Sequence, residues 1–213
     1  EGRIVFGNMM KYIKMTVSSN FGNVFSVLIA SAFLPFLPML SIQLLVQNLI
    51  YDIAQLTIPW DRMDEEDLLL PTKWATSELL NFTFAIGPIS SIFDILTFML
   101  MWFVFKANTP QDAALFHTGW FVIGLITQTV VVHVIRTKKI PFIQSRASIG
   151  VTLSTIIVVI AAILIPGSRF GTYIDLVGLP SNYWIWAFVI IVGYIVLMQI
   201  VKRIYIKVNK QWL

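Results

Sequence analysis

Asp52 is the first candidate for chemistry, because this carboxylate lies inside a long apolar run of the 213-residue chain. An ionisable side chain in hydrocarbon costs at least about 2.5 to 3.5 kcal/mol on insertion scales, so such a residue indicates a functional site. Asn48 precedes Asp52 by four residues and Gln55 follows it by three. This spacing predicts three oxygen-bearing side chains on one face of an otherwise apolar helix.

A second pair of amides, Asn20 and Asn23, lies in the preceding apolar segment, three residues apart on one helix face. We expect this face to look toward Asp52. One carboxylate with several amide carbonyls is an oxygen-only ligand set, which suits a hard cation such as Mg²⁺ or Ca²⁺. The spacing leaves a second interpretation equally open, in which these amides only form hydrogen bonds from helix to helix.

Other polar residues inside the apolar runs are expected to have structural roles. We expect Asp94 to pair with a neighbouring helix, and Gln128 and His133 to serve packing or capping. The sequence contains no cysteine, which excludes disulfides and thiolate metal sites, and its two histidines are far apart, which argues against zinc. No catalytic residue is predicted.

Two charged segments are expected to lie outside the membrane. The basic cluster from Arg136 to Arg146 is predicted to signal topology and to contact lipid head groups. The acidic run from Asp61 to Asp67 is predicted to form a solvated loop.

The composition defines the class of protein in which these residues must be placed. Hydrophobic residues make up 57% of the chain and charged residues only 12%, whereas soluble domains average about 25% charged. This balance excludes a water-soluble globular protein and a disordered chain. A polytopic membrane protein remains. The net charge of +4 arises from basic residues at the predicted membrane boundaries, so no nucleic-acid partner is predicted.

Six apolar runs predict an all-α fold with six transmembrane helices, since one span needs about 20 mostly apolar residues. The first run is long enough for two spans, and Pro35 and Pro38 mark the reversal between them. The predicted helices cover residues 17–35, 39–58, 80–105, 115–135, 149–166 and 184–201.

The distribution of basic residues predicts the orientation of the helices. Of the 15 Lys and Arg residues, only Lys106 and Arg169 fall on the side opposite the termini. The positive-inside rule therefore places both termini in the cytoplasm. Residues 1–16 are predicted to extend the first helix into the cytoplasm as a stalk, and residues 17–213 to form the six-helix transmembrane domain.

Several stretches resemble the P-type cation-transporting ATPases. The Asn48-x-x-x-Asp52 pattern is similar to the motif of their sixth transmembrane helix, which binds the transported ion. The resemblance extends across the whole chain and is most similar to the bacterial magnesium-transporting members. It is carried by Glu1–Arg3, Asn8–Lys11, Ser18–Asn23, Gln47–Asp52, Ile58–Asp64 and Ile140–Ala147.

This resemblance implies that Asn20, Asn23, Asn48 and Asp52 line an intramembrane cation site. In calcium pumps, the position of Asn23 is typically Glu and that of Tyr51 typically Thr, so this chain has lost one carboxylate. A single, partly hydrated Mg²⁺ fits better, because that ion gives up its water reluctantly. The resemblance implies import of Mg²⁺ into the cytoplasm across the bacterial inner (plasma) membrane.

The resemblance also implies partners, because the motifs for phosphorylation are missing. Neither the Asp-Lys-Thr-Gly-Thr motif nor the Thr-Gly-Glu loop occurs in this chain, and its first residue is Glu1 and not Met. We expect a piece of a longer pump, whose partners are the lipid bilayer, the remaining transmembrane helices and cytoplasmic catalytic domains that use MgATP. The alternatives are a stand-alone six-span cation-binding or accessory protein without ATPase activity, and a passive channel or secondary transporter.

Overall fold

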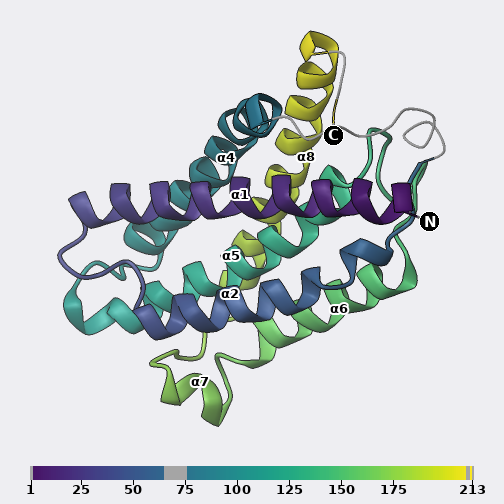
Figure 1. Cartoon of the computed structure of the whole chain (residues 1–213). Coiled ribbons are helices and arrows are strands. Elements are labelled where there is room, and N and C mark those ends of the chain that lie inside the picture. The colour runs from purple at the N-terminus through teal and green to yellow at the C-terminus, as the bar shows by residue number, and fades with distance from the viewer. Residues whose placement is uncertain (1, 65–75, 210–211, 213) are drawn as a thin grey trace.

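The computed structural model describes residues 2–64, 76–209 and 212 of the chain (Figure 1). The regular secondary structure of this part is helical, with one isolated bridge between Pro141 and Ser145 and no strand. The helices are α1 (Gly2–Phe33), α2 (Ser41–Gln55), the 3-10 turn η1 (Ile58–Trp60), α4 (Thr76–Met99), its π-helical continuation η2 (Leu100–Val104), the 3-10 turn η3 (Pro110–Asp112), α5 (Ala113–Ile135), α6 (Ile149–Leu164), α7 (Arg169–Tyr173) and α8 (Tyr183–Asn209).

The prediction of a helix in each of the six apolar runs is confirmed by α1, α2, α4, α5, α6 and α8. The chain leaves α1 after Phe33 and enters α2 at Ser41, so the reversal falls on the segment that contains Pro35 and Pro38. Proline lacks the backbone donor that a continued helix needs. α1 is continuous from Gly2, whereas the assignment of residues 1–16 to a cytoplasmic stalk stays a prediction.

Among the described residues, four helical segments are long and apolar enough to cross a membrane: Gly2–Phe33, Thr76–Val104, Pro110–Ile135 and Tyr183–Asn209. α2 has 15 residues and α6 has 16. At about 1.5 Å per residue, these two helices are shorter than the hydrocarbon core, which is about 30 Å thick. The part of the chain that the structure describes is therefore a helical bundle with four candidate spans, the shorter apolar helix α6 and the short, partly polar helix α2.

α5 is the central helix of the bundle. It packs against α1, α2, α4, α6 and α8, and nearly all its side chains from Phe116 onward are buried. A helix that is apolar all round has no surface to turn toward water, so a central position is the expected place for it. Figure 1 shows α5 passing between α1 on one side and α2 and α6 on the other.

α1 and α4 approach each other closely at Gly22. A Cβ atom built at Gly22 would lie 3.0 Å from the carbonyl oxygen of Gly87 and 3.1 Å from Ser90 Cβ. Ser91 Oγ donates to the carbonyl oxygen of Gly22 at 3.0 Å. The absence of a side chain at Gly22 lets the two backbones come within reach of this hydrogen bond.

The surface of the bundle carries many large apolar side chains. Phe33, Ile149, Ile185 and Leu28 are each more than 60% exposed. Such extended apolar exposure is unusual on a monomer in water and is typical of a surface that meets lipid or another protein.

Candidate functional site

The buried face of α2 is polar and packs against α5 and α6. It carries Gln43, Gln47, Tyr51 and Gln55, which repeat every four residues and are each at most 3% exposed. Gln47 Nε2 donates to the backbone carbonyl of Phe121 in α5 at 3.3 Å. Polar side chains therefore fasten α2 to the central helix.

Asn48 and Asp52 lie beside this face, about 100° further round the helix. Asn48 is half-buried and Asp52 is exposed, and neither side chain has a hydrogen-bond partner among the residues that the structure describes. Of the predicted polar stripe, only Gln55 is buried, and its Oε1 accepts a hydrogen bond from Thr16 Oγ1 of α1 at 3.1 Å. The stripe is divided because the packing face of α2 runs through every fourth residue from Gln43.

The two asparagines of α1 also differ in their surroundings. Asn20 is exposed, whereas Asn23 is half-buried and its Oδ1 accepts a hydrogen bond from Gln128 Nε2 of α5 at 2.7 Å. The Oε1 atom of Gln128 is buried and has no hydrogen-bond partner in the described part of the chain. Gln128, for which the sequence favours a packing role, therefore lies next to a predicted ligand with one oxygen free. The sequence feature that could have indicated a role for Gln128 at the site is its position between two threonines in an apolar run.

The four predicted ligands are not joined to one another. From α1 to α2, Thr16 forms a side-chain hydrogen bond with Gln55, and Ser19 interacts with the hydroxyl of Tyr51; neither contact involves a predicted ligand. Residues 2–64 and 76–209 hold no group of three or more His, Cys, Asp or Glu side chains that could bind a metal. The candidate set is thus one carboxylate with amide oxygens, which suits a hard cation that keeps part of its water.

A small polar cavity of about 10 Å³ lies beside the buried face of α2, between α5 and α6. Tyr51 and Gln55 line it together with Thr129, Ser154 and Thr155. The hydroxyl of Tyr51 interacts with the side chains of Ser19 in α1 and Gln55.

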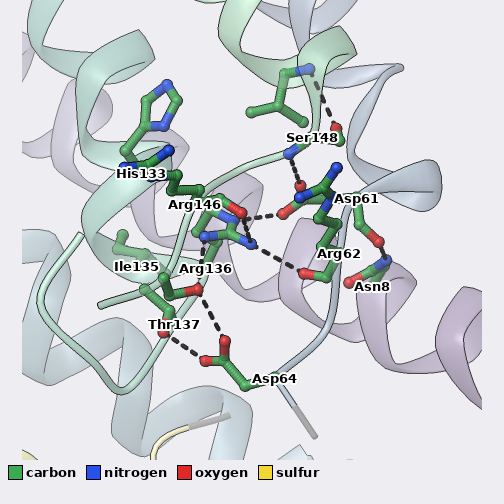
Figure 2. A network of polar contacts seen from close by, with 12 residues as sticks. Asn8, Asp61, Arg62, Asp64, His133, Ile135, Arg136, Thr137, Arg146 and Ser148 are labelled. Atoms are coloured by element: carbon green, nitrogen blue, oxygen red, sulfur yellow. Dashed lines mark hydrogen bonds and ion pairs between the residues drawn. The ribbon is translucent and has the colours of Figure 1, made fainter. Parts of the chain in front are cut away.

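A buried ion pair joins the segment after η1 to the end of α5 (Figure 2). Arg136 Nε donates to Asp61 Oδ2, and the side chains are 2% and 1% exposed. The other carboxylate oxygen of Asp61 accepts from the backbone N–H of Ser148 at 2.7 Å. Asn8 Nδ2 of α1 donates to the backbone carbonyl of Asp61 at 2.7 Å. The cluster therefore ties α1, α5 and the start of α6 together.

The guanidinium of Arg136 uses three of its four other N–H donors within the protein. It donates to Ser145 Oγ at 3.1 Å and to the carbonyl oxygens of Arg62 at 2.9 Å and Arg146 at 3.3 Å. The prediction that Arg136 contacts lipid head groups is wrong, and so is the prediction that Asp61 belongs to a solvated loop. Each group supplies the charge that the other needs in order to be buried. Residues 65–67 of the acidic run lie outside the described residues.

Asp64 lies at the edge of the same cluster. It accepts hydrogen bonds from the hydroxyls of Thr137 and Ser145. Partial burial acts to raise the pKa of Asp64, but the two hydrogen bonds and the nearby charges of Lys11 and Arg136 outweigh it. The pKa of this carboxyl group is therefore below its ordinary value.

The prediction that Asp94 pairs with a neighbouring helix is confirmed. Asp94 lies five residues before the end of α4 and is 6% exposed. Oδ2 is 2.6 Å from Ser26 Oγ of α1, and Oδ1 accepts from Trp120 Nε1 of α5 at 2.8 Å. His133 contacts Thr155 Oγ1 of α6 at 2.9 Å, in line with its predicted packing role.

Lys202 of α8 is fully buried, although its charge counts toward the predicted topology signal. Its Nζ donates to carbonyl oxygens at and just after the end of α5, those of Val134, Thr137 and Lys139, at 2.9, 3.1 and 2.9 Å. The last carbonyl groups of a helix lack partners within that helix, and a cation there is stabilised by the helix dipole. Trp212 Nε1 also donates to a carbonyl at this helix end, that of Ile135, at 2.6 Å.

Apolar helices of spanning length, with polar and ionisable side chains buried between them, are typical of an integral membrane protein. The family described as "Cation transporting ATPase, C-terminus" matches residues 36–204, and the chain belongs to this family. The resemblance noted from the sequence is thereby confirmed.

Curated relatives agree with this family. The chain is 56% identical over 205 residues to "Magnesium-transporting ATPase, P-type 1" of Escherichia coli strain K12, a match that covers 96% of this chain and 23% of the relative. A protein of the same name from Salmonella typhimurium strain LT2 is 55% identical over 212 residues, which is 100% of this chain and 23% of the relative. The chain thus spans less than a quarter of the length of these relatives.

Proposed function

We propose that this chain is the C-terminal membrane part of an ATP-driven P-type Mg²⁺ transporter of the bacterial inner membrane. The identity of 56% over 96% of the chain to magnesium-transporting ATPases carries this proposal and favours it over a stand-alone accessory protein. Six spans with both termini in the cytoplasm complete the topology. The four candidate spans of the structure and the excess of basic residues on one predicted side support it.

The transported ion is a single, partly hydrated Mg²⁺, held by Asn20, Asn23, Asn48 and Asp52 with oxygen ligands from the rest of the pump. Asp52 and Asn20 are exposed on α2 and α1, without partners among the described residues. A carboxylate left facing lipid costs at least about 2.5 kcal/mol. Further helices of the pump are the natural cover for this surface, and they would complete the ion site.

ATP hydrolysis belongs to the cytoplasmic domains of the same pump, which bind MgATP. Their phosphorylation cycle moves α1, and α1 carries Asn20 and Asn23 on the same continuous helix as residues 2–16. The continuity of this helix supports a mechanical link between the cytoplasmic domains and the ion site. Mg²⁺ enters the cytoplasm when the site opens to that side.

The variant Asp52→Asn in the complete pump tests this function. We expect it to insert normally and to lose Mg²⁺-stimulated ATPase activity and Mg²⁺ uptake into proteoliposomes. Asp175→Asn is the matched control, because it removes the same charge from an exposed residue after α7. Its φ of 59° is one that asparagine adopts readily. Unchanged Mg²⁺ activation in Asp52→Asn would remove Asp52 from the site, and a wild-type pump that ignores Mg²⁺ would refute the function.

A further inference from the structure

Asp94 is an acidic group inside the bundle without a cationic partner. No described Lys, Arg or His forms an ion pair with it. α1 and α5 face the carboxylate with the uncharged side chains of Ser26 and Trp120, and the titratable group that interacts with it from α8 is Tyr194. A buried charge of this kind is costly unless it is paired, whereas a neutral carboxylic acid is not.

The hydroxyl of Ser26 has one proton but two oxygen neighbours. Ser26 Oγ is 2.6 Å from Asp94 Oδ2 and 2.9 Å from the carbonyl oxygen of Gly22. A hydroxyl donates only one hydrogen bond and accepts others. If Ser26 donates to Gly22, the short contact to Asp94 is a hydrogen bond only when Oδ2 carries a proton and donates it to Ser26.

Both charge states of Asp94 therefore fit the same heavy-atom positions. In the ionised state, Ser26 donates to Asp94 Oδ2, and Ser91 Oγ still donates to the carbonyl of Gly22 at 3.0 Å. In the neutral state, Asp94 donates to Ser26, and Ser26 turns its proton to Gly22. Trp120 Nε1 donates to Oδ1 in both states. The exchange needs only the rotation of one hydroxyl group.

Asp94 is also close to the candidate cation site along α1. Its partner Ser26 follows Asn23 by three residues, or about 4.5 Å along the helix axis. Trp120 and Gln128, which contact Asp94 and Asn23 respectively, lie two turns apart on α5. Asp94 forms no hydrogen bond with any of the four predicted ligands. Asp94 is thus connected to the candidate site through α1 and α5, and the charge of a cation bound there would favour its ionised form.

We propose that Asp94 is a proton-binding site, occupied by a proton when the cation site is empty and released when Mg²⁺ binds. This inference rests on the proposed function for the identity of the cation. The step is balanced: the carboxylic acid loses one proton to water, Ser26 turns its hydroxyl to the carboxylate, and Mg²⁺ brings positive charge to the neighbouring site. Nearby positive charge favours the ionised form of a carboxyl group. Import of Mg²⁺ would thereby be accompanied by movement of a proton.

Infrared spectroscopy of the complete pump in detergent tests the proposal, because a carboxylic acid and a carboxylate absorb at different frequencies. Without ATP and Mg²⁺ at neutral pH, we expect a band of a buried carboxylic acid that is lost in Asp94→Asn and retained in the matched control Asp175→Asn. Addition of Mg²⁺ alone should diminish this band in the wild type. Ser26→Ala keeps the carboxyl group but removes its partner, and should shift the band without abolishing it.

The outcomes separate the two proposals. A band that is absent from the wild type or unchanged in Asp94→Asn would overturn the proton site, and so would a band that Mg²⁺ leaves unchanged in a pump that Mg²⁺ drives. A band that is lost in Asp94→Asn and diminished by a different divalent cation, in a pump that Mg²⁺ does not stimulate, would uphold the proton site and refute the identity of the ion. If Asp94→Asn fails to fold, the shift in Ser26→Ala makes the assignment, and an unshifted band would overturn it.

Discussion

Replacement of Asp61 by alanine removes the counter-charge of a buried guanidinium. Arg136 is 2% exposed, so it cannot recover its hydration in the variant. Removal of one partner of a buried ion pair typically costs about 3 to 5 kcal/mol. The backbone N–H of Ser148 also loses its acceptor at 2.7 Å, a loss that costs about 1 to 3 kcal/mol when the donor stays buried. The two losses overlap, so we expect Asp61→Ala to destabilise the chain by about 3 to 5 kcal/mol.

Unfolding of the chain in detergent by increasing SDS, followed by far-UV circular dichroism, measures this difference. Asp112→Asn is the control, since Asp112 is exposed and asparagine keeps an acceptor for Thr109 Oγ1 and a favourable N-cap residue for α5, so stability should change by less than about 0.5 kcal/mol. The double variant Asp61→Ala/Arg136→Met should lose much less than the sum of the single variants, because it leaves no unpaired charge. A loss below about 1 kcal/mol in Asp61→Ala, or additive losses in the double variant, would refute the reasoning.

Two further predictions concern α1 and the loop after η1. Gly22→Ala places a methyl group 3.0 Å from the carbonyl oxygen of Gly87, and should lower the free energy of unfolding by about 1 to 3 kcal/mol; a neutral effect in the same SDS assay would contradict the close α1–α4 contact. The lowered pKa of Asp64 predicts a stabilisation that is fully present above the unfolded value of about 3.9 and lost as the pH falls through the folded value. The stability difference between wild type and Asp64→Asn should therefore shrink as the pH falls below about 5, and a constant difference would contradict it.

The positions of the helices could be predicted because each depends on its own stretch of sequence. Apolar runs and prolines are local signals, and α2, for example, lies at Ser41–Gln55 within the predicted range of 39–58. The partner of a buried charge is a different kind of information. Asp61 and Arg136 are 75 residues apart, and each belongs to a charged segment that reads as solvated or lipid-facing. Their pairing depends on how α1, α5 and α6 pack, which no local pattern contains.

The candidate site shows the same limit within a single helix. The spacing of Asn48, Asp52 and Gln55 correctly predicts that they lie near one another on α2, but periodicity does not say which part of that face is covered. α2 packs against α5 and α6 with the face that includes Gln55, and Asp52 lies outside this face. An apolar helix carries a weak signal for its own orientation, because both sides of it can be buried.

The structure bears on the two interpretations that the spacing leaves open for these polar residues. A role as structural glue requires a partner on the neighbouring helix, and Asn23 has one in Gln128. Asp52, Asn48 and Asn20 have no such partner within the described residues. The carboxylate of Asp94, by contrast, forms hydrogen bonds with side chains of two neighbouring helices. Asp94 is enclosed with two hydrogen-bond donors, whereas Asp52 is exposed on its helix. We therefore expect Asp52, and not Asp94, to bind a ligand supplied from outside this chain.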